Sequence, residues 1–344
     1  METGLTLEDF EPFFRAVMKR VTGEETAPYP WQKRLVETVF RDGWPEAIDL
    51  PTGSGKTSVL AIAVFLLALE AGRPPAERKT GLRIIYTVDR RLIVDQAEKF
   101  SEALKAVIDR ADEKKDDVPG RVRRALLSYG GEGALDVLKL RGGLYGRLPW
   151  VREPNRPTII LTTVDQIGSR LLFRGYGTGR RQWPVHAALS AIDAIYFLDE
   201  VHLSWPFAET LSHVRRLLSF EPLVGNELPP LRRVIMSGTI PKGMEAGSVF
   251  RLDESDRNHP GLKSRLEARR FVRVVEKSLA PSSEQRETEQ IAEWLAEEAA
   301  GLREGAGGPI AIIANRVATA RAVFERFKDE AVLLTGRVRP YDRR

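Results

Sequence analysis

Hydrophobic and polar positions follow two different rhythms along this chain. Between residues 7 and 42 apolar residues recur at helical spacing, and Pro28 and Pro30 divide the stretch into two helices. Short apolar runs then alternate with amphipathic stretches. The runs predict strands at Ala47–Leu50, Arg83–Val88, Thr158–Thr162, Ala194–Leu198 and Arg233–Ser237, with helices at Thr57–Leu69, Arg91–Ile108, Val164–Leu172 and Phe207–Ser219. Such alternation predicts an α/β fold with a parallel sheet sandwiched by helices.

Two stretches interrupt this alternation, and a third unit follows it. The charged residues 109–124 predict a solvated helix end or loop, and the Gly-, Pro- and Arg-rich residues 141–157 predict a loop. A composition break at 281–289 precedes a second α/β pattern. It predicts helices at Thr288–Leu302 and Ala318–Lys328 and strands at Ile310–Ala314 and Ala331–Leu334.

Composition narrows the class of protein. The chain has 344 residues, enough for two domains at about 150 residues each. A net charge of +5 suits a polyanionic partner. With no cysteine, disulfides and thiolate metal sites are excluded, which suits the cytoplasm. The longest apolar run, residues 59–69, is shorter than the roughly 20 residues of a membrane span, so no membrane role is predicted.

The segment Leu50–Thr57 predicts a phosphate-binding loop, because it follows an apolar strand and opens an apolar helix. Its glycines allow the backbone N–H groups to curl around a phosphate, and a helix N-terminus adds further donors. Lys56 would contact the β- and γ-phosphates of ATP, and the Thr57 hydroxyl would ligate Mg²⁺. Leu50 departs from the usual small first residue. The predicted nucleotide contacts are Pro51, Thr52, Gly53, Ser54, Gly55, Lys56 and Thr57.

A second chemical signal is the acidic pair Asp199-Glu200, which follows the strand at 194–198. Open parallel sheets bind ligands at the carboxyl ends of their strands. Asp199 would hold Mg²⁺ through water, and Glu200 would orient and deprotonate the attacking water. His202 has no role that its chemistry alone assigns. Taken without the phosphate loop, the acidic pair would more commonly be explained as a helix cap.

Further segments fall in the order found in superfamily 2 helicases, and the chain resembles that family. Gln32 resembles the adenine-reading glutamine, and Ser237-Gly238-Thr239 the motif that couples hydrolysis to strand movement. Segments 86–91 and 162–166 resemble strand-contact motifs. Segments 313–316 and 334–337 resemble the opening motifs of a second motor domain. The resemblance implies that His202, Ser237 and Thr239 couple ATP hydrolysis to movement along the strand.

The resemblance narrows to the helicase–nuclease of type I CRISPR systems. It rests on residues 86–96, Arg141-Gly142-Gly143, Thr163–Gln166, Leu171–Gly177 and Asp199–Leu203. That family implies an ATP-driven motor on single-stranded DNA, recruited by an RNA-guided surveillance complex in a prokaryotic cytoplasm. The spacing resembles the subtype whose nuclease follows the helicase. No His-Asp pair occurs in the sequence, so no nuclease centre is expected here.

The resemblance also implies contacts to DNA phosphates from Arg90, Arg91, Thr162, Thr163 and Asn315. The two arginines could instead cap or solvate a helix start. Arg141 and Trp150 could stack on DNA or lie in a plain surface loop. Tyr29 and Trp31 could stack near the adenine or pack between helices.

The predicted organisation is an N-terminal helical segment at 1–27, a first RecA-like domain at 28–280, and the incomplete start of a second at 281–344. The chain stops before the arginine motif of the second domain, so weak ATP turnover is expected. Two alternatives remain open. One is another superfamily 2 translocase of restriction or repair. The other is a nucleotide-dependent nucleic-acid-binding module without turnover.

Overall fold

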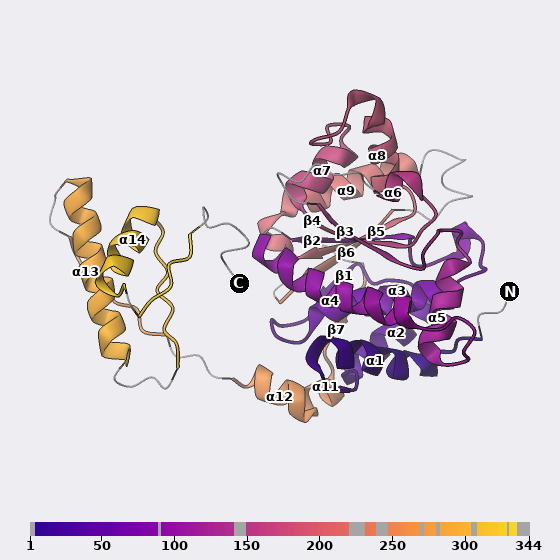
Figure 1. Cartoon of the computed structure of the whole chain (residues 1–344), viewed down its shortest axis with the longest axis horizontal. Helices are drawn as coiled ribbons and strands as arrows, with labels where there is room; N and C mark the ends of the chain where they lie inside the picture. Colours follow the sequence, from indigo (N-terminus) through magenta and orange to yellow (C-terminus); the bar gives the residue numbers. More distant parts are fainter. Residues whose placement is uncertain are drawn as a thin grey trace. The chain divides into compact units, whose positions relative to one another are not determined.

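The computed structural model of the chain contains two compact units, Met1–Arg269 and Arg270–Arg344 (Figure 1). The structure describes residues 4–88, 91–140, 149–219, 231–238, 247–268, 272–279, 283–303, 308–328 and 330–335. Each unit is described by itself below.

A seven-stranded parallel sheet forms the centre of the first unit. Its strand order is β3-β4-β2-β5-β6-β1-β7, and every described pairing is parallel. The strands are β1 (Ala47–Asp49), β2 (Arg83–Val88), β3 (Asp136–Leu140), β4 (Thr158–Thr163), β5 (Ala194–Asp199), β6 (Arg232–Ser237) and β7 (Val249–Arg251). The predicted α/β fold with a parallel sheet is confirmed.

Helices cover both faces of this sheet (Figure 1). One face carries α1 (Phe10–Thr22), α2 (Pro30–Asp42), α3 (Val59–Leu69), α4 (Arg91–Arg110) and α5 (Val118–Leu127). The other carries α6 (Pro149–Arg152), α7 (Val164–Leu171), α8 (Trp183–Ala191) and α9 (Trp205–Leu218). Two short helices, α11 (Glu254–Asn258) and α12 (Pro260–Leu266), follow β7. The N-terminal helix α1 belongs to the same core, since it buries Phe10, Phe13, Phe14 and Val17.

Side-chain alternation along the strands decides which residues meet which helix layer. In β2, Ile84 and Tyr86 join the core beneath α3, whereas Ile85 joins the opposite core. The helix α3 is apolar throughout and almost wholly buried. No helix among the described residues is long and apolar enough to cross a membrane.

Two predicted loops contain helices instead. Residues 109–124 were expected to be solvated, but α5 begins at Val118 and buries Val122. The Asp117 carboxylate caps this helix by accepting a hydrogen bond of 2.8 Å from Gly120 N. In the second loop the short helix α6 carries Trp150, which is 2% exposed against the His186 ring. The interpretation of Trp150 as a DNA-stacking residue is therefore wrong.

The second unit packs two helices, α13 (Glu284–Arg303) and α14 (Val317–Arg326), against each other. The predicted strands at 310–314 and 331–334 do not form: among the described residues, neither segment is paired into a sheet, which a strand requires. Ile313 and Val332 are 88% and 84% exposed, so the apolar runs that predicted these strands lie largely in solvent.

Candidate functional site

The segment between β1 and α3 forms a tight loop. Gly53 and Gly55 both have φ of +86°, a conformation that side chains disfavour. The Ser54 hydroxyl donates to Pro51 O at 2.7 Å and closes the turn. A 3-10 turn at Lys56–Ser58 then leads into α3. The loop is therefore anchored to a buried helix at the end of β1.

Residues of α2 brace this loop from one side. The Trp31 indole donates to Ser54 O at 3.2 Å and is fully buried. Gln32 donates through Nε2 to Ser58 Oγ at 2.6 Å, and its Oε1 accepts from Tyr29 N at 2.7 Å. Trp31 thus packs between helices, as one of its two interpretations predicted. The Oε1 and Nε2 atoms of Gln32 therefore each have one partner within the protein. One N–H of Nε2 and one lone pair of Oε1 remain for a nucleotide base.

The alternation of side chains along β5 places Asp199 on the sheet face that lies beside this loop. Asp199 ends β5 on the same face as Phe197, which packs beneath α3. The neighbouring strand presents Tyr86 there, and its hydroxyl donates to Asp199 Oδ2 at 2.6 Å. The Thr57 side chain lies close enough to this hydroxyl to influence the pKa of Tyr86. The phenol of Tyr86 therefore lies near both side chains predicted to ligate Mg²⁺, Thr57 and Asp199.

The Lys56 ammonium lies between the two carboxylates. Its Nζ is 3.1 Å from Glu200 Oε1 and 3.8 Å from Asp199 Oδ1. Glu200 adopts a left-handed backbone (φ +51°, ψ +52°), rare for a residue with a side chain. This turn directs the Glu200 carboxylate toward Lys56 immediately after the strand ends. Strained backbone of this kind is common at functional sites.

Burial dominates the electrostatics of Asp199. It raises the pKa of this carboxyl above its ordinary value, while the Tyr86 hydrogen bond and the Lys56 charge act in the opposite direction. Among the described residues, none donates a hydrogen bond to Asp199 Oδ1. A buried carboxylate oxygen without a donor suits a cation or a bound water. The pKa of Tyr86 is raised well above its ordinary value, first by burial and then by the Asp199 charge.

The predicted coupling residues lie at the ends of β5 and β6. His202 Nδ1 is 3.5 Å from Glu200 Oε2, and the imidazole is 46% exposed. Ser237 is fully buried, and its carbonyl accepts from Leu50 N at 3.2 Å. The following Gly238 packs against Pro51, where an added Cβ would lie 3.5 Å from the Pro51 Cα. Thr239 lies outside the described residues.

The predicted nucleic-acid contacts fall in both units, and each is described within its own unit. Thr162 is fully buried at the end of β4, and its hydroxyl donates to Thr163 O at 3.1 Å. Thr163 is half-buried and starts α7. Arg91 begins α4, although its side chain is outside the described part of the chain, as is the whole of Arg90. Arg141 also falls outside the described residues.

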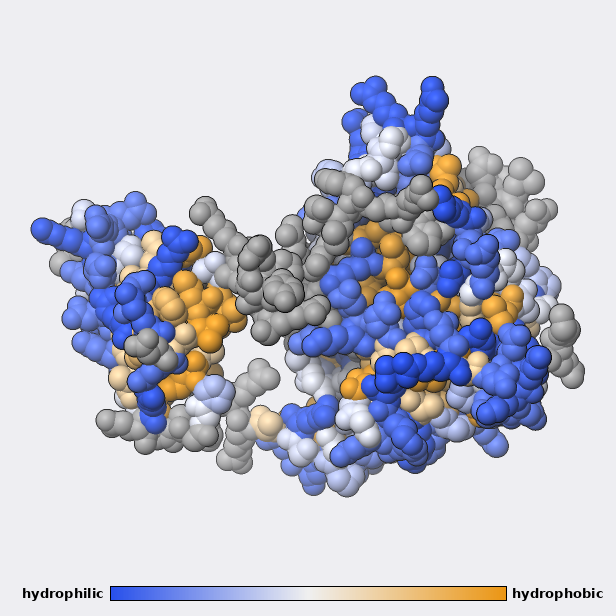
Figure 2. All heavy atoms as spheres, viewed as in Figure 1, coloured by the Kyte–Doolittle hydropathy of each residue, from blue (hydrophilic) through white to orange (hydrophobic). Residues whose placement is uncertain are grey.

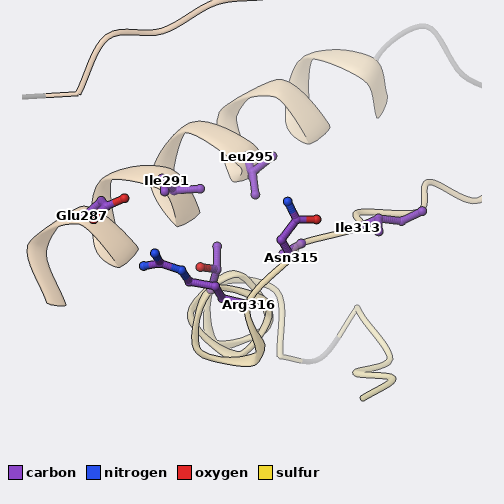
Figure 3. Close-up of a pocket in the computed structure, with 8 residues that line it drawn as sticks. Glu287, Ile291, Leu295, Ile313, Asn315 and Arg316 are labelled. Atoms are coloured by element: carbon purple, nitrogen blue, oxygen red, sulfur yellow. The ribbon is translucent and has the colours of Figure 1, made fainter. Parts of the chain in front are cut away.

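Asn315 belongs to the second unit, where it lines an open pocket between α13 and the start of α14 (Figure 3). The pocket has a volume of about 290 Å³. Ile291 and Leu295 line it from α13, and Arg316, which also lines it, lies 3.6 Å from Glu284.

Two contributions to the Lys56 site were not predicted as site residues. Tyr86 was assigned only to a strand-contact motif, and an alternating apolar strand gives no signal that its hydroxyl meets Asp199. Arg265 on α12 donates to Gly53 O at 3.0 Å, from more than 200 positions along the chain. No spacing rule connects residues so distant in sequence.

No protein-family model and no curated protein sequence matches this chain. Among solved structures it is similar to the DEAD-box helicase Mss116 bound to ssRNA and UDP-BeF, at 13% identity and a TM-score of 0.47. It is also similar to Mss116p with NTE and C-tail double deletion, bound to ssRNA and AMP-PNP, at 14% identity and a TM-score of 0.46. Both similarities cover 87% of this chain, and 53% and 52% of those chains, respectively. The chain thus spans about half the length of these solved proteins, and at these identities the likeness is one of fold.

Proposed function

We propose that this chain is the ATP-dependent motor portion of a nucleic-acid helicase. One observation carries the proposal. Lys56 lies at the end of the glycine-rich loop that follows β1. It contacts Asp199 and Glu200 at the carboxyl end of β5, which is separated from β1 in the sheet by β6. A mobile cation, backbone donors and two carboxylates converge there, and this combination suits hydrolysis of a nucleoside triphosphate.

The phosphate loop would hold the nucleotide. Backbone N–H groups of Gly53 to Thr57 would surround the β-phosphate, and Lys56 would move from Glu200 to the β- and γ-phosphate oxygens. Thr57 and Asp199 would hold Mg²⁺, which supplies charge neutralisation at the phosphates. No group of three or more acidic or histidine side chains able to hold a metal occurs in the described residues. The remaining ligands of the ion would therefore be phosphate oxygens and waters.

Glu200 would then act on the attacking water. Once the phosphates hold Lys56, the Glu200 carboxylate is free to accept a hydrogen bond from water and to take its proton. His202, adjacent to Glu200, and Ser237 and Thr239, after β6, would transmit the state of the γ-phosphate. Ser237 fits this role because its carbonyl is hydrogen-bonded to Leu50 at the start of the phosphate loop.

The finer identity rests on the motif resemblance. We propose single-stranded DNA as the track, contacted by Arg90, Arg91, Thr162, Thr163 and Asn315, and recruitment to an RNA-guided CRISPR surveillance complex in a prokaryotic cytoplasm. We also propose residues 28–280 as the first RecA-like domain and 281–344 as the start of the second. A repeat array beside the gene would favour this role over a restriction or repair translocase.

The decisive experiment compares Lys56→Ala and Glu200→Gln with the wild-type chain and with Glu209→Gln, an exposed glutamate on α9. Fluorescent ATP measures binding, and phosphate release with oligo(dT) measures turnover. Lys56→Ala should lose binding. Glu200→Gln should keep binding but slow hydrolysis by about 100- to 10,000-fold. Glu209→Gln should behave as the wild type.

The two open alternatives give different results. A non-catalytic binding module would show no nucleic-acid-stimulated phosphate release, so Glu200→Gln would change nothing. A motor would release oligo(dT) on hydrolysis, and Glu200→Gln would stay trapped on it with ATP bound. Wild-type hydrolysis by Glu200→Gln would remove the assigned water-activating role.

A further inference from the structure

The longest acid-free segment around the sheet lies between Asp165 and Asp193. Residues 166–192 contain no aspartate or glutamate but include four arginines, at positions 170, 174, 180 and 181. We call residues 172–183, which connect α7 to α8, the basic loop. In Figure 1 it forms the projection above these helices, and Figure 2 shows long hydrophilic side chains extending from the same projection.

A buried arginine shapes this loop from below. Arg170 is 4% exposed and donates to Gln166 O at 2.7 Å and to Tyr176 O at 3.3 Å. Burial lowers the pKa of its guanidinium, with no described carboxylate beside it to offset the cost. The positive charge in the core of the loop therefore adds to that of the arginines above it.

Internal hydrogen bonds give the loop a defined shape. Arg174 N donates to Ser169 O at 2.6 Å, and Thr178 Oγ1 donates to Gly175 O at 2.8 Å. The Trp183 indole donates to Thr178 O at 3.2 Å. Phe173 has a φ of +58°, a left-handed conformation that a bulky residue rarely adopts. The backbone is thus held in a strained form that orders the tip.

This ordered tip exposes rings and cations together. The side chains of Phe173 and Tyr176 are 55% and 53% exposed, and Leu172 beside them is 55% exposed. Arg174, Arg180 and Arg181 are exposed, and within the described residues none of them forms an ion pair. The Arg180 guanidinium lies 5.9 Å from the centre of the Trp183 ring. Exposed aromatic rings beside exposed arginines combine the two kinds of side chain that contact the bases and the phosphates of a single strand.

We propose that the basic loop is a stacking platform for single-stranded nucleic acid. Phe173 and Tyr176 would stack on bases, while Arg174, Arg180 and Arg181 would contact the adjacent phosphates. This inference rests on the proposed motor function and extends it, because none of the residues predicted to contact the strand lies in this loop. A single strand fits better than a duplex, whose bases are already stacked on one another.

Binding of a fluorescein-labelled oligo(dT) to the whole chain, followed by anisotropy at several salt concentrations, tests the proposal. The double variant Phe173→Leu/Tyr176→Leu keeps apolar bulk but loses both rings. It should bind roughly 5- to 30-fold more weakly for each base that loses its stacking partner. The matched variant Phe173→Tyr/Tyr176→Phe keeps both rings and should bind as the wild type does.

Charge is tested separately. For Arg180→Ala/Arg181→Ala, the slope of log affinity against log salt should become shallower by about 1.4, which is about 0.7 per lost phosphate contact. The matched control is Arg20→Ala/Arg110→Ala, which removes two exposed helix-end arginines elsewhere in the unit. It should leave the slope unchanged.

Fluorescent ATP binding, measured on the same samples, separates failure of this inference from failure of the proposed function. If ATP and oligo(dT) bind normally to both loop variants, the loop proposal is overturned and the motor proposal stands. If the wild-type chain binds ATP but not oligo(dT), both nucleic-acid roles fail. Binding of the wild type, but not of the ring-deleted variant, to phosphatidylserine vesicles, with oligo(dT) affinity unchanged, would make the loop a membrane contact instead.

Discussion

The hydroxyl oxygen of Tyr86 lies 2.6 Å from Oδ2 of Asp199, and both side chains are buried at the end of adjacent parallel strands. This bond gives the buried carboxylate a strong neutral donor. It also fixes which oxygen of Asp199 faces inward. The other oxygen, Oδ1, then faces Lys56, whose Nζ is 3.8 Å away. A cation would be held by this oxygen.

Replacing Tyr86 by Phe should therefore affect both stability and metal–nucleotide binding. The variant loses a hydrogen bond to a charged group, worth about 1.5–3 kcal/mol in the free energy of unfolding. The Asp199 carboxylate also loses its orientation, so Mg²⁺-dependent ATP affinity should fall. Urea unfolding and fluorescent ATP titrations with and without Mg²⁺ measure the two effects.

Tyr196→Phe is the matched control for this change. Tyr196 is equally buried, lies one strand away on β5, and donates at 2.7 Å to the neutral Ser190 carbonyl. Its removal should cost about 1 kcal/mol and leave Mg²⁺-dependent ATP affinity unchanged. Equal ATP affinities for Tyr86→Phe and Tyr196→Phe would contradict the role of Tyr86.

A second prediction concerns nucleotide choice. The Gln32 amide keeps one N–H and one lone pair after bonding Ser58 and Tyr29, and an adenine N6/N7 edge complements both. Gln32→Ala should lower ATP affinity roughly 10-fold or more while changing GTP affinity less. Ser58→Ala, which removes the partner but keeps the amide, should preserve the preference for ATP. Parallel losses of ATP and GTP binding in Gln32→Ala would make its role purely structural.

A third prediction concerns the buried ion pair between Arg78 and Asp193, 2.9 Å apart and 3% and 7% exposed. Asp193 also accepts from Leu82 N at 3.0 Å and has a φ of +53°. Asp193→Ala leaves a buried guanidinium unpaired and should cost about 3–5 kcal/mol of unfolding free energy.

Asp193→Asn should be milder, because asparagine tolerates the left-handed backbone and still accepts from Leu82 N. Urea denaturation of both variants gives the comparison. Identical midpoints for the Ala and Asn variants would show that the Leu82 hydrogen bond and the left-handed backbone add nothing beyond the lost charge. Wild-type midpoints in both variants would contradict the predicted cost of unpairing Arg78.

A fourth prediction is a loss of stability in mild acid. Burial lowers the pKa of His186, and the nearby Arg170 charge lowers it further. Its Nδ1 has no hydrogen-bond partner among the described residues. The fold therefore favours the neutral ring. The contribution of neutral His186 to the free energy of unfolding is fully present above pH 6.5, about the pKa of histidine in the unfolded chain. It declines as the pH falls below that value, because the unfolded chain then takes up a proton more readily than the folded one.

Urea midpoints between pH 7.5 and 5 would measure this effect. His186→Asn should flatten the part of the profile just below pH 6.5, even if its overall stability is lower. An unchanged slope in that variant would assign the acid sensitivity to other groups.

Much of the first unit could be predicted from sequence, because its central strands are continuous apolar runs. Arg83–Val88 was predicted with its observed bounds, and Asp199 lies where a parallel sheet places a ligand. The edge strand β3 was missed because its residues are mostly half-buried and its pattern is weak. The helix α5 was missed because the many charged residues in this segment obscured the helical spacing of the few apolar residues that it buries.

The second unit shows the opposite limit. Its apolar runs near Ile313 and Val332 have strand character, but a strand forms only when it pairs with another. In the described part of this unit neither segment is paired into a sheet. In the first unit, the residue types at the Lys56 site were predictable, whereas the Tyr86 and Arg265 contacts depend on how distant elements pack.

The contact between Lys56 and Glu200 has a thermodynamic consequence for nucleotide affinity. The site contains its own competitor, since a γ-phosphate that binds Lys56 must displace the Glu200 carboxylate from the same ammonium. The measured affinity for ATP is therefore lower than the Lys56–phosphate contact alone would give, because Lys56 exchanges the Glu200 carboxylate for the γ-phosphate. Neutralising the competitor with Glu200→Gln should tighten ATP binding by several-fold, about 1 kcal/mol, even as it abolishes turnover. The water-activating residue would then also set how readily the motor empties its site after each cycle.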